Sequence, residues 1–385
     1  MRLIPIDGTP AAVRVLRRAL GDALAGSGAT VLPVGPGQSG DFARPDVAVE
    51  QGAALVVRTS GSTGTPKGVL LSAAALRASA EATHRRLGGP GTWLLALPAQ
   101  HIAGAQVVVR SIMAGTDLSV MAAGGFRGRA FAEAASDVLG AMGPRYTSLV
   151  PTQLTRLLDE GGDALAALRA FDAVLVGGAA TSAATLARAR EAGVRVVTTY
   201  GMSETAGGCV YDGAPLDGVR VRIVDGLVHL GGPTLALGYR LDPTATASAF
   251  VDGWFRTSDL GRLHSGTLEI LGRADDVINT GGVKIAAAAV ERVLTGQPGI
   301  ADACVVGLPD PEWGQRVAAV VSPSRRPHRT NEHQVDETAA LAAVRAELGP
   351  AATPRVLRVV AALPLCGPGK IDRAAVAKLL ADENR

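Results

Sequence analysis

The stretch that decides the fold reads Thr59-Ser-Gly-Ser-Thr-Gly-Thr-Pro-Lys-Gly68. Apolar runs flank it at 53–57 and 69–71, so we place it as a loop between two strands. Its three glycines allow backbone amides to converge, while five hydroxyl side chains and Lys67 add donors and a positive charge. A polyphosphate requires this combination of groups. The alternative is a flexible polar linker, which has no need of a rigid Pro66 before a single cation.

The composition excludes several classes of protein. The 385 residues are enough for two domains. A net charge of +3 with both signs mixed, and an aromatic content of only 3%, argue against nucleic acid as a partner. No apolar run reaches membrane-spanning length and the N-terminus lacks a signal-peptide core, so we expect no membrane insertion. The three cysteines are far apart and odd in number, which is typical of the reducing cytoplasm, and we predict a cytoplasmic protein.

Lysine is rare in this chain, since only four of the 38 basic residues are lysines. They are Lys67, Lys284, Lys370 and Lys378. A lysine is a compact cation on a flexible stem, and arginine replaces it poorly where the positive charge must follow a moving anion. The first three lysines stand in glycine-rich or motif-like surroundings and are therefore candidates for a functional role.

Secondary-structure patterns divide the chain into three parts. Residues 10–24 have apolar side chains at helical spacing, and from 93 to 198 short apolar strands alternate with helices. This alternation predicts crossover connections and a mostly parallel sheet with helices on its faces. From about Pro215 short strands dominate, beginning with a hairpin whose turn is Asp225-Gly226. A mixed pattern follows from Arg273 onward.

We therefore predict an α/β fold with a large N-terminal domain, residues 1–273, and a small α+β C-terminal domain, residues 274–385. The large domain would hold mostly parallel, helix-flanked sheets and a β-rich subdomain at about 215–272. After the hairpin, the expected strands of this subdomain are 254–257, 260–263 and 267–271.

Two polar segments follow predicted strands, at the position where open α/β sheets bind ligands. Small residues from Gly177 to Ala180 would let a flat ligand lie against the backbone, or simply form a tight turn. In Tyr200-Gly-Met-Ser-Glu-Thr205 the tyrosine can stack on a base. Ser203 and Glu204 can bind a phosphate and its Mg²⁺, because Mg²⁺ is often held by one carboxylate and substrate phosphates. The alternative is an ordinary capped helix start.

Asp259 and Arg273 form a further candidate pair. A carboxylate is a natural acceptor for the two hydroxyls of a ribose, and an arginine can complete that contact. The alternative is a salt bridge on the surface.

Five motifs, in this order, resemble those of the adenylate-forming superfamily of acyl- and aryl-CoA ligases, luciferases and peptide-synthetase adenylation domains. They are 59–68, 200–205, 253–261, 272–285 and 369–373. The resemblance implies an ATP-dependent ligase that forms an acyl-adenylate and then an acyl-CoA thioester. Its implied co-substrates are ATP with Mg²⁺, coenzyme A and a small aromatic carboxylate. The small domain would be mobile.

The resemblance also assigns a role to individual positions. The residues that would bind the ATP phosphates are Thr59, Ser60, Gly61, Ser62, Thr63, Gly64, Lys67 and Ser203. Those that would line the adenine and ribose sites are Gly178, Ala179, Ala180, Tyr200, Asp259 and Arg273. The remaining assignments are Glu204 as the Mg²⁺ ligand, Lys370 as the catalytic lysine of adenylation, Asp275 as the hinge, and Gly282 with Lys284 for the thioester step.

The segment 200–218 is similar to that of short actinobacterial o-succinylbenzoate–CoA ligases of menaquinone biosynthesis. In this resemblance His101 is a catalytic histidine that lines the acyl pocket. Arg110, nine residues further on, would serve the second carboxylate of o-succinylbenzoate, and the alternative is a surface arginine.

Other functions stay open at this point. They are a different aryl- or acyl-CoA ligase, a stand-alone adenylating enzyme that loads a carrier protein, and a non-catalytic nucleotide-binding protein. Only 58 residues precede the phosphate-binding stretch, fewer than in typical members, and a homodimer that compensates for them is one expectation.

Overall fold

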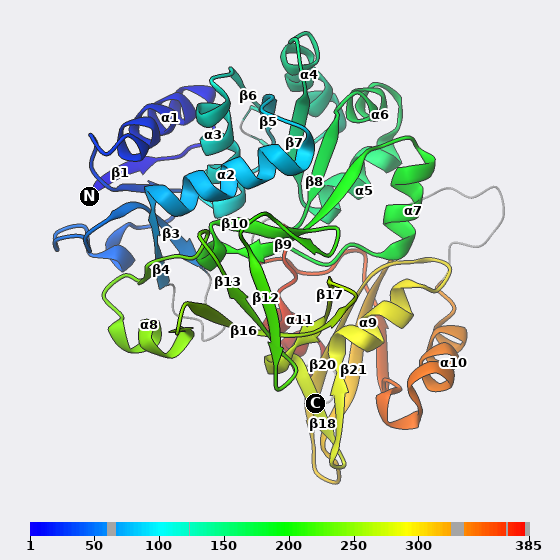
Figure 1. Cartoon of the computed structure of the whole chain (residues 1–385). Coiled ribbons are helices and arrows are strands. Elements are labelled where there is room, and N and C mark those ends of the chain that lie inside the picture. The colour runs from blue at the N-terminus through cyan, green and yellow to red at the C-terminus, as the bar shows by residue number, and fades with distance from the viewer. Residues whose placement is uncertain (60–66, 123, 325–334, 367–368, 382–385) are drawn as a thin grey trace.

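Four β-sheets with surrounding helices make up the structure, a computed structural model that describes residues 1–59, 67–122, 124–324, 335–366 and 369–381. The first three sheets occupy the upper and middle parts of the view in Figure 1. The fourth sheet, coloured yellow to orange, extends below them (Figure 1).

The first sheet contains the strands that flank the phosphate-binding stretch. Its strand order is β1-β2-β3-β4-β14, with the first two pairs parallel and the last two antiparallel. The bounds are β1 Arg2–Pro5, β2 Val31–Val34, β3 Ala53–Thr59, β4 Lys67–Ser72 and β14 Gly238–Tyr239. The predicted helix α1 (Pro10–Leu24) is confirmed. The Thr9 hydroxyl caps it by accepting a hydrogen bond from the amide of Ala12 at 3.2 Å.

The second sheet is the predicted helix-flanked sheet, and its strand order is β11-β10-β9-β8-β7-β5-β6. The five strands from β9 to β6 run parallel. Bounds are β5 Thr92–Leu95, β6 Leu118–Val120, β7 Arg145–Leu149, β8 Ala173–Val176, β9 Val196–Met202, β10 Gly207–Tyr211 and β11 Ala214–Pro215.

Helices cover both faces of this sheet because its strands are apolar on both sides. On β5, Trp93 and Leu95 join the core under α2 and α3, whereas Leu94 joins the core under α4 to α7. Neighbouring side chains of a strand point to opposite faces, so each face requires its own cover. The helices are α2 Ala73–Leu87, α3 Ile102–Ala114, α4 Gly128–Leu139, α5 Pro151–Glu160, α6 Gly162–Arg169 and α7 Ala183–Glu191.

The third sheet is antiparallel and corresponds to the predicted β-rich part. The hairpin turn Asp225-Gly226 is confirmed, and both residues have positive φ values, 51° and 79°. The prediction of separate strands at 254–257 and 260–263 is wrong, because an irregularity between Leu260 and Gly261 lets one strand continue. The elements are β12 Arg220–Val224, β13 Leu227–Gly231, α8 Pro243–Ala249, β15 Phe250–Val251, β16 Trp254–His264 and β17 Thr267–Arg273.

The fourth sheet has apolar cores of its own on both faces. Val305 on β20 faces α9 and α10, whereas its neighbour Cys304 faces α11. The strand order is β19-β18-β21-β20, and β22 pairs with β21. Bounds are β18 Val277–Thr280, β19 Val283–Ala286, α9 Ala287–Thr295, β20 Ile300–Asp310, β21 Gly314–Pro323, α10 Glu337–Leu348, β22 Val356–Val359 and α11 Arg373–Ala381.

Candidate active site

Tyr200 and Asp259 meet although they lie on different sheets. The Tyr200 hydroxyl, on β9, donates a hydrogen bond of 2.7 Å to Oδ2 of Asp259, on β16. Burial, together with the Asp259 carboxylate, raises the pKa of Tyr200 far above its usual range, so the hydroxyl stays a donor. The amide of Asp259 donates to the Thr257 hydroxyl at 3.0 Å, which orients the carboxylate further.

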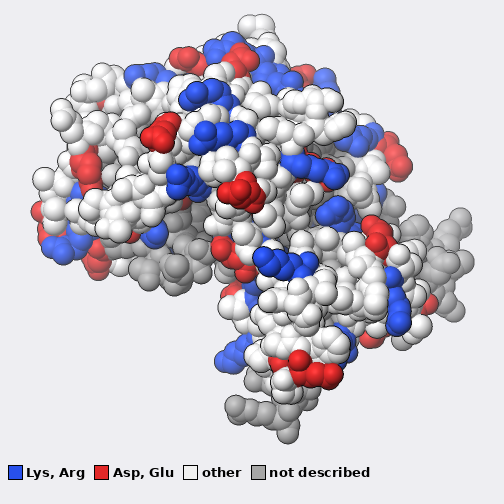
Figure 2. Space-filling model, turned by 60° about the horizontal axis from the view of Figure 1, so that its bottom comes forward, with Lys and Arg blue, Asp and Glu red and all other residues white. Residues whose placement is uncertain are grey.

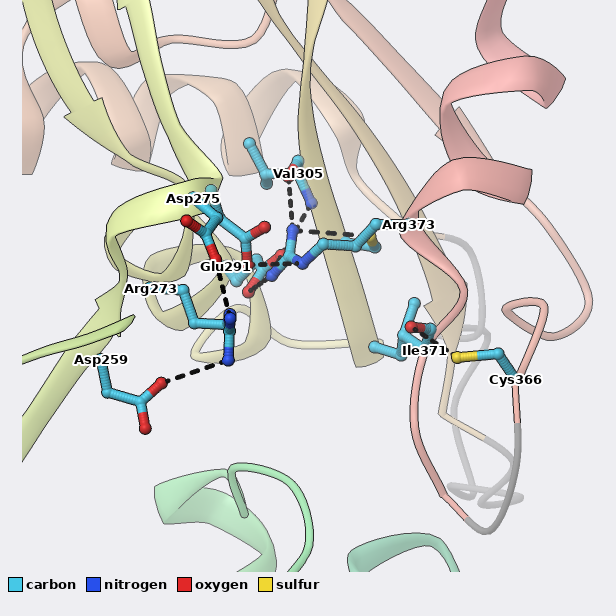
Figure 3. A network of polar contacts seen from close by, with 10 residues as sticks. Asp259, Arg273, Asp275, Glu291, Val305, Cys366, Ile371 and Arg373 are labelled. Carbon is cyan, nitrogen blue, oxygen red and sulfur yellow. Dashed lines mark hydrogen bonds and ion pairs between the residues drawn. The ribbon is translucent and has the colours of Figure 1, made fainter. Parts of the chain in front are cut away.

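Arg273 lies between two aspartates (Figure 3). Its Nη1 is 3.5 Å from Oδ1 of Asp259, and its Nη2 is 2.8 Å from Oδ2 of Asp275. The Asp259 side chain is 13% exposed and that of Arg273 is 42% exposed, so the two form a partly buried salt bridge. The residues predicted for the ribose and for the hinge are therefore in direct contact.

Tyr239 contacts both Lys67 and Glu204, and it is not among the site residues predicted from the sequence. The Tyr239 hydroxyl donates to Oε1 of Glu204 at 3.0 Å, and the Nζ of Lys67 lies 4.8 Å from the centre of the tyrosine ring. Pairing of β14 with β4 places Tyr239 opposite Val69, two residues from Lys67. No local pattern could reveal this contact, because the two strands are far apart in the sequence.

Glu204 fits the predicted role of a magnesium ligand. Burial raises the pKa of its carboxyl, although the Tyr239 hydrogen bond and the charge of Lys67 oppose that shift. No group of three or more His, Cys, Asp or Glu residues in the described part of the chain could hold a metal. A Mg²⁺ ion held by Glu204 would therefore take its other ligands from substrate phosphates and water, as Mg²⁺ commonly does.

The phosphate-binding stretch is described only at its ends. Thr59 ends β3 and pairs with Lys67 at the start of β4, so the predicted flanking strands are confirmed. Ser60, Gly61, Ser62, Thr63 and Gly64 lie outside the described residues. Ser203 is the first residue of a short 3-10 helix, Ser203–Thr205, and is buried.

The segment that carries Lys370 lies against the second sheet. Leu365 and Ile371 form a β-bridge, and the Cys366 amide donates to the Lys370 carbonyl at 2.9 Å. Gly369, with φ of 65°, lies so close to Val150 that an added Cβ would be 2.8 Å from the valine Cβ.

Val150 also marks the predicted adenine site. It follows β7, and its Cγ1 would lie 3.7 Å from a Cβ at Gly178. Gly178, Ala179 and Ala180 follow β8 and are exposed. The Lys370 segment and the small residues after β8 therefore meet at the same edge of the sheet.

Gly282 and Lys284 lie elsewhere in this structure. Gly282 lies in the turn between β18 and β19, Lys284 lies on β19, and both are exposed. In the same turn the Gly281 amide donates to the Trp313 carbonyl at 2.9 Å. Figure 1 shows β18 near the lower tip of the molecule, away from β8 and β9. The residues predicted for the two half-reactions are thus separated.

Arg110 lies on α3, and His101 directly precedes this helix. His101 is the residue before its first turn, and burial together with the charge of Arg58 lowers the pKa of the imidazole, which favours its neutral form. Arg110 is only 3% exposed, so the alternative of a surface arginine is wrong.

Arg110 is a buried cation without a carboxylate partner in the described residues. Its Nη2 donates to the Tyr211 hydroxyl at 3.2 Å, its Cζ lies 5.1 Å from the centre of the Trp93 ring, and its Nε has no hydrogen-bond partner. Burial lowers the pKa of Arg110 and, with Arg110, lowers the pKa of the neighbouring His84 to about 4. Such a site favours the arrival of an anion.

Charges of both signs are interspersed over the face in Figure 2, and that view shows no continuous basic stripe. Among the described residues, none of the helices is both long and apolar enough to span a bilayer. The absence of a nucleic-acid partner stays a prediction.

Comparison with known proteins shows the class to which this site belongs. The profile of the AMP-binding enzyme family matches residues 18–239, and that of the AMP-binding enzyme C-terminal domain matches residues 289–370. The chain therefore belongs to the AMP-binding enzyme family, and the predicted superfamily and its ligase class are confirmed.

Two relatives with a known or probable activity are similar to this chain over most of its length. A probable 2-succinylbenzoate–CoA ligase of Mycobacterium tuberculosis is 49% identical over 343 residues, which cover 87% of this chain and 86% of the relative. The 2-succinylbenzoate–CoA ligase of Escherichia coli is 34% identical over 273 residues, 68% of this chain and 57% of the relative.

Solved structures confirm the α/β fold class. An Escherichia coli MenE variant with bound OSB-AMS has a TM-score of 0.78 and 27% identity, covering 98% of this chain and 87% of that one. The amide bond synthetase McbA from Marinactinospora thermotolerans has a TM-score of 0.76 and 29% identity, with 92% and 75% covered.

Proposed function

We propose that this protein is a 2-succinylbenzoate–CoA ligase that acts in menaquinone biosynthesis. The observation that carries the proposal is Arg110, a buried guanidinium on the helix that begins beside His101. Burying an unpaired charge is costly, and a substrate with a second carboxylate supplies the missing partner. The names of the relatives in Mycobacterium tuberculosis and Escherichia coli support the same substrate.

In the first half-reaction, an oxygen of the succinyl carboxylate attacks the α-phosphorus of ATP. The new bond joins that oxygen to phosphorus, and the bond to pyrophosphate breaks. Both reactants are anions, so Lys67 and Lys370 would offset the charge that gathers on the phosphates. Glu204 would hold a Mg²⁺ ion, which when bound neutralises phosphate charge. Tyr200 and Asp259 would hold the nucleoside.

In the second half-reaction, the thiolate of coenzyme A attacks the acyl carbon and AMP leaves. Lys370 has no part in this step. We infer that residues 274–385 form a mobile domain that rotates about Asp275 and brings Gly282 and Lys284 to the adenylate. The separation of these residues from the Lys370 segment supports this inference, since one orientation cannot serve both steps.

Thioester formation from ATP, coenzyme A and a panel of acids tests the substrate. We expect turnover with 2-succinylbenzoate and much weaker turnover with benzoate or fatty acids, which lack the second carboxylate. Turnover of benzoate or fatty acids without turnover of 2-succinylbenzoate would overturn the proposal. A product that appears on a carrier protein but not on coenzyme A would favour the stand-alone adenylating enzyme.

We further expect a cytoplasmic protein and a homodimer. Light scattering of the purified chain measures the second property directly, and a monomer at the enzyme's working concentration would contradict it.

A further inference from the structure

The segment that carries Lys370 ends in Arg373, whose guanidinium is engaged at all three nitrogens. Its Nε is 3.0 Å from Oδ2 of Asp276, and its Nη2 is 2.8 Å from Oε1 of Glu291. Its Nη1 donates to the Val305 carbonyl at 2.7 Å. Figure 3 shows Arg373 reaching from the start of α11 toward Glu291 and Val305. The Arg373 side chain, at the start of α11, therefore contacts the 3-10 helix of residues 274–276, α9 and β20.

The Asp276 contact places this junction beside the proposed hinge. Asp275 and Asp276 are neighbours in the 3-10 helix Ala274–Asp276, and each is bound by a different arginine. Arg273 binds Asp275 and also approaches Asp259, on the ribose side. Arg373 binds Asp276 on the side of Lys370. Ion pairs thus run from Asp259 through Arg273 to Asp275, and from its neighbour Asp276 to Arg373. Figure 3 shows the first of these pairs, with Arg273 between Asp259 and Asp275.

Glu291 makes this junction rigid. Oε1 of Glu291 accepts a hydrogen bond from the Val305 amide at 2.9 Å while the same carboxylate is paired with Arg373. Burial raises the pKa of Glu291, and the positive charge of Arg373 opposes that shift. A planar guanidinium can bond in several fixed directions, which a lysine ammonium on a flexible stem does not reproduce.

The link from Arg373 back to Lys370 is short. Asp372 donates its amide to the Pro364 carbonyl at 2.9 Å, and the bridge between Leu365 and Ile371 closes the segment. Only two residues separate Lys370 from Arg373. A displacement of Arg373 is therefore passed to the lysine backbone.

We propose that Arg373 is a positioning residue for Lys370, because it fixes the base of the lysine segment to the residue that follows the hinge. The proposal rests on the proposed roles of Lys370 and Asp275. A rotation at Asp275 then carries Lys370 to the phosphates in one defined position. Loss of this fixation lowers the rate of adenylation and spares the thioester step, in which Lys370 takes no part.

The test compares the two half-reactions in the full chain with Arg373→Lys. Acyl-adenylate formation from ATP and 2-succinylbenzoate is measured in a single turnover, and thioester formation is measured from supplied acyl-adenylate and coenzyme A. We expect the first rate to fall on the order of 100-fold, since a displacement of about 1 Å has that effect, while the second stays unchanged. Arg292→Lys is the matched control, because Arg292 follows Glu291 on α9 and is exposed.

Equal losses in both half-reactions would assign Arg373 a merely structural role and overturn the proposal, as would an unchanged adenylation rate. If Arg373→Lys fails to fold, Asp276→Asn removes only the hinge-side partner and leaves the contacts with Glu291 and Val305. In Asp276→Asn we also expect adenylation to slow while thioester formation keeps its rate. An unchanged adenylation rate would again refute the proposal. Failure of the unaltered protein to adenylate 2-succinylbenzoate would instead refute the proposed function.

Discussion

At the scale of single residues, the least expected finding is the pair of buried basic side chains beside Trp93. Arg110 and His84 lie in an apolar layer between the second sheet and its helices. Arginine can hardly lose its proton at neutral pH, so the imidazole is the group that stays neutral, and the guanidinium is left to attract an anion.

Replacing Arg110 should change the choice of acid. In Arg110→Gln we expect kcat/KM for 2-succinylbenzoate to fall by about 10- to 100-fold, because a hydrogen bond to a charged group contributes about 1.5–3 kcal/mol. The slow adenylation of 4-oxo-4-phenylbutanoate, which keeps the reacting succinyl carboxylate and lacks the aromatic one, serves as the internal control and should not change. An equal loss for both acids would contradict a role in binding the second carboxylate.

His84 should make stability depend on pH. Its pKa is about 4 in the folded protein and 6.5 ordinarily, so the unfolded chain takes up the proton first as the pH falls. The contribution of the neutral imidazole to the free energy of unfolding is complete above about pH 6.5 and is lost toward pH 4. About 2 kcal/mol of this free energy is lost between pH 7 and pH 5. Urea unfolding at both pH values measures this loss. In His84→Asn the pH dependence should be smaller, and an unchanged dependence would contradict the assignment.

At the scale of elements, contacts between segments far apart in the sequence build the site. Pairing of β14 with β4 brings Tyr239 between Lys67 and Glu204. Contact between β7, β8 and the Lys370 segment centres on Val150. Both contacts join surfaces that a local sequence pattern does not describe.

Gly369→Ala should disturb the contact at Val150. The new Cβ would lie 2.8 Å from the valine Cβ at a residue with positive φ, so the segment must shift. We expect adenylation to slow by about tenfold, which corresponds to ~1.4 kcal/mol. The rate is measured in a single turnover with ATP and 2-succinylbenzoate.

Two further variants separate the possible causes. Gly349→Ala also places an alanine at a positive φ, 86° compared with 65° at Gly369, and nothing lies within 4 Å of the added Cβ, so it should leave the adenylation rate unchanged. Adding Val150→Gly to Gly369→Ala removes the clash and should restore part of the rate. A loss of similar size in Gly349→Ala would show that backbone strain, and not the contact, is responsible.

At the scale of the whole molecule, the structure has Gly369 and Lys370 near Val150, beside the predicted adenine site. The turn with Gly282 joins β18 to β19, near the lower tip of the view in Figure 1. This arrangement is suited to adenylation. In the proposed mechanism, the thioester step requires another orientation of the same sheet.

The variant Lys370→Ala tests whether Lys370 acts in adenylation and not in thioester formation. We expect the variant to lose acyl-adenylate formation and to convert supplied acyl-adenylate to the thioester at the rate of the unaltered protein. Both rates are measured in single turnovers with 2-succinylbenzoate or its adenylate. Loss of both activities would refute the role assigned to Lys370.

Local elements of the fold were predictable because short-range rules govern them. The helical spacing of apolar side chains predicted α1, and the dipeptide Asp225-Gly226 predicted its hairpin turn. The continuation of β16 through Leu260 was not predictable, since hydrogen bonds to β17 maintain the strand across the irregularity.

The sequence by itself determined the class of enzyme, because five ordered motifs, among them those with Tyr200, Glu204, Asp259 and Lys370, resemble those of the adenylate-forming superfamily. Only the tertiary structure decided that Arg110 is buried, that Tyr239 contacts both Lys67 and Glu204, and that Arg373 pairs with Asp276, the neighbour of the predicted hinge residue. The physical reason is that burial and ion pairing depend on which distant segments come together, and no local pattern of residues contains that information.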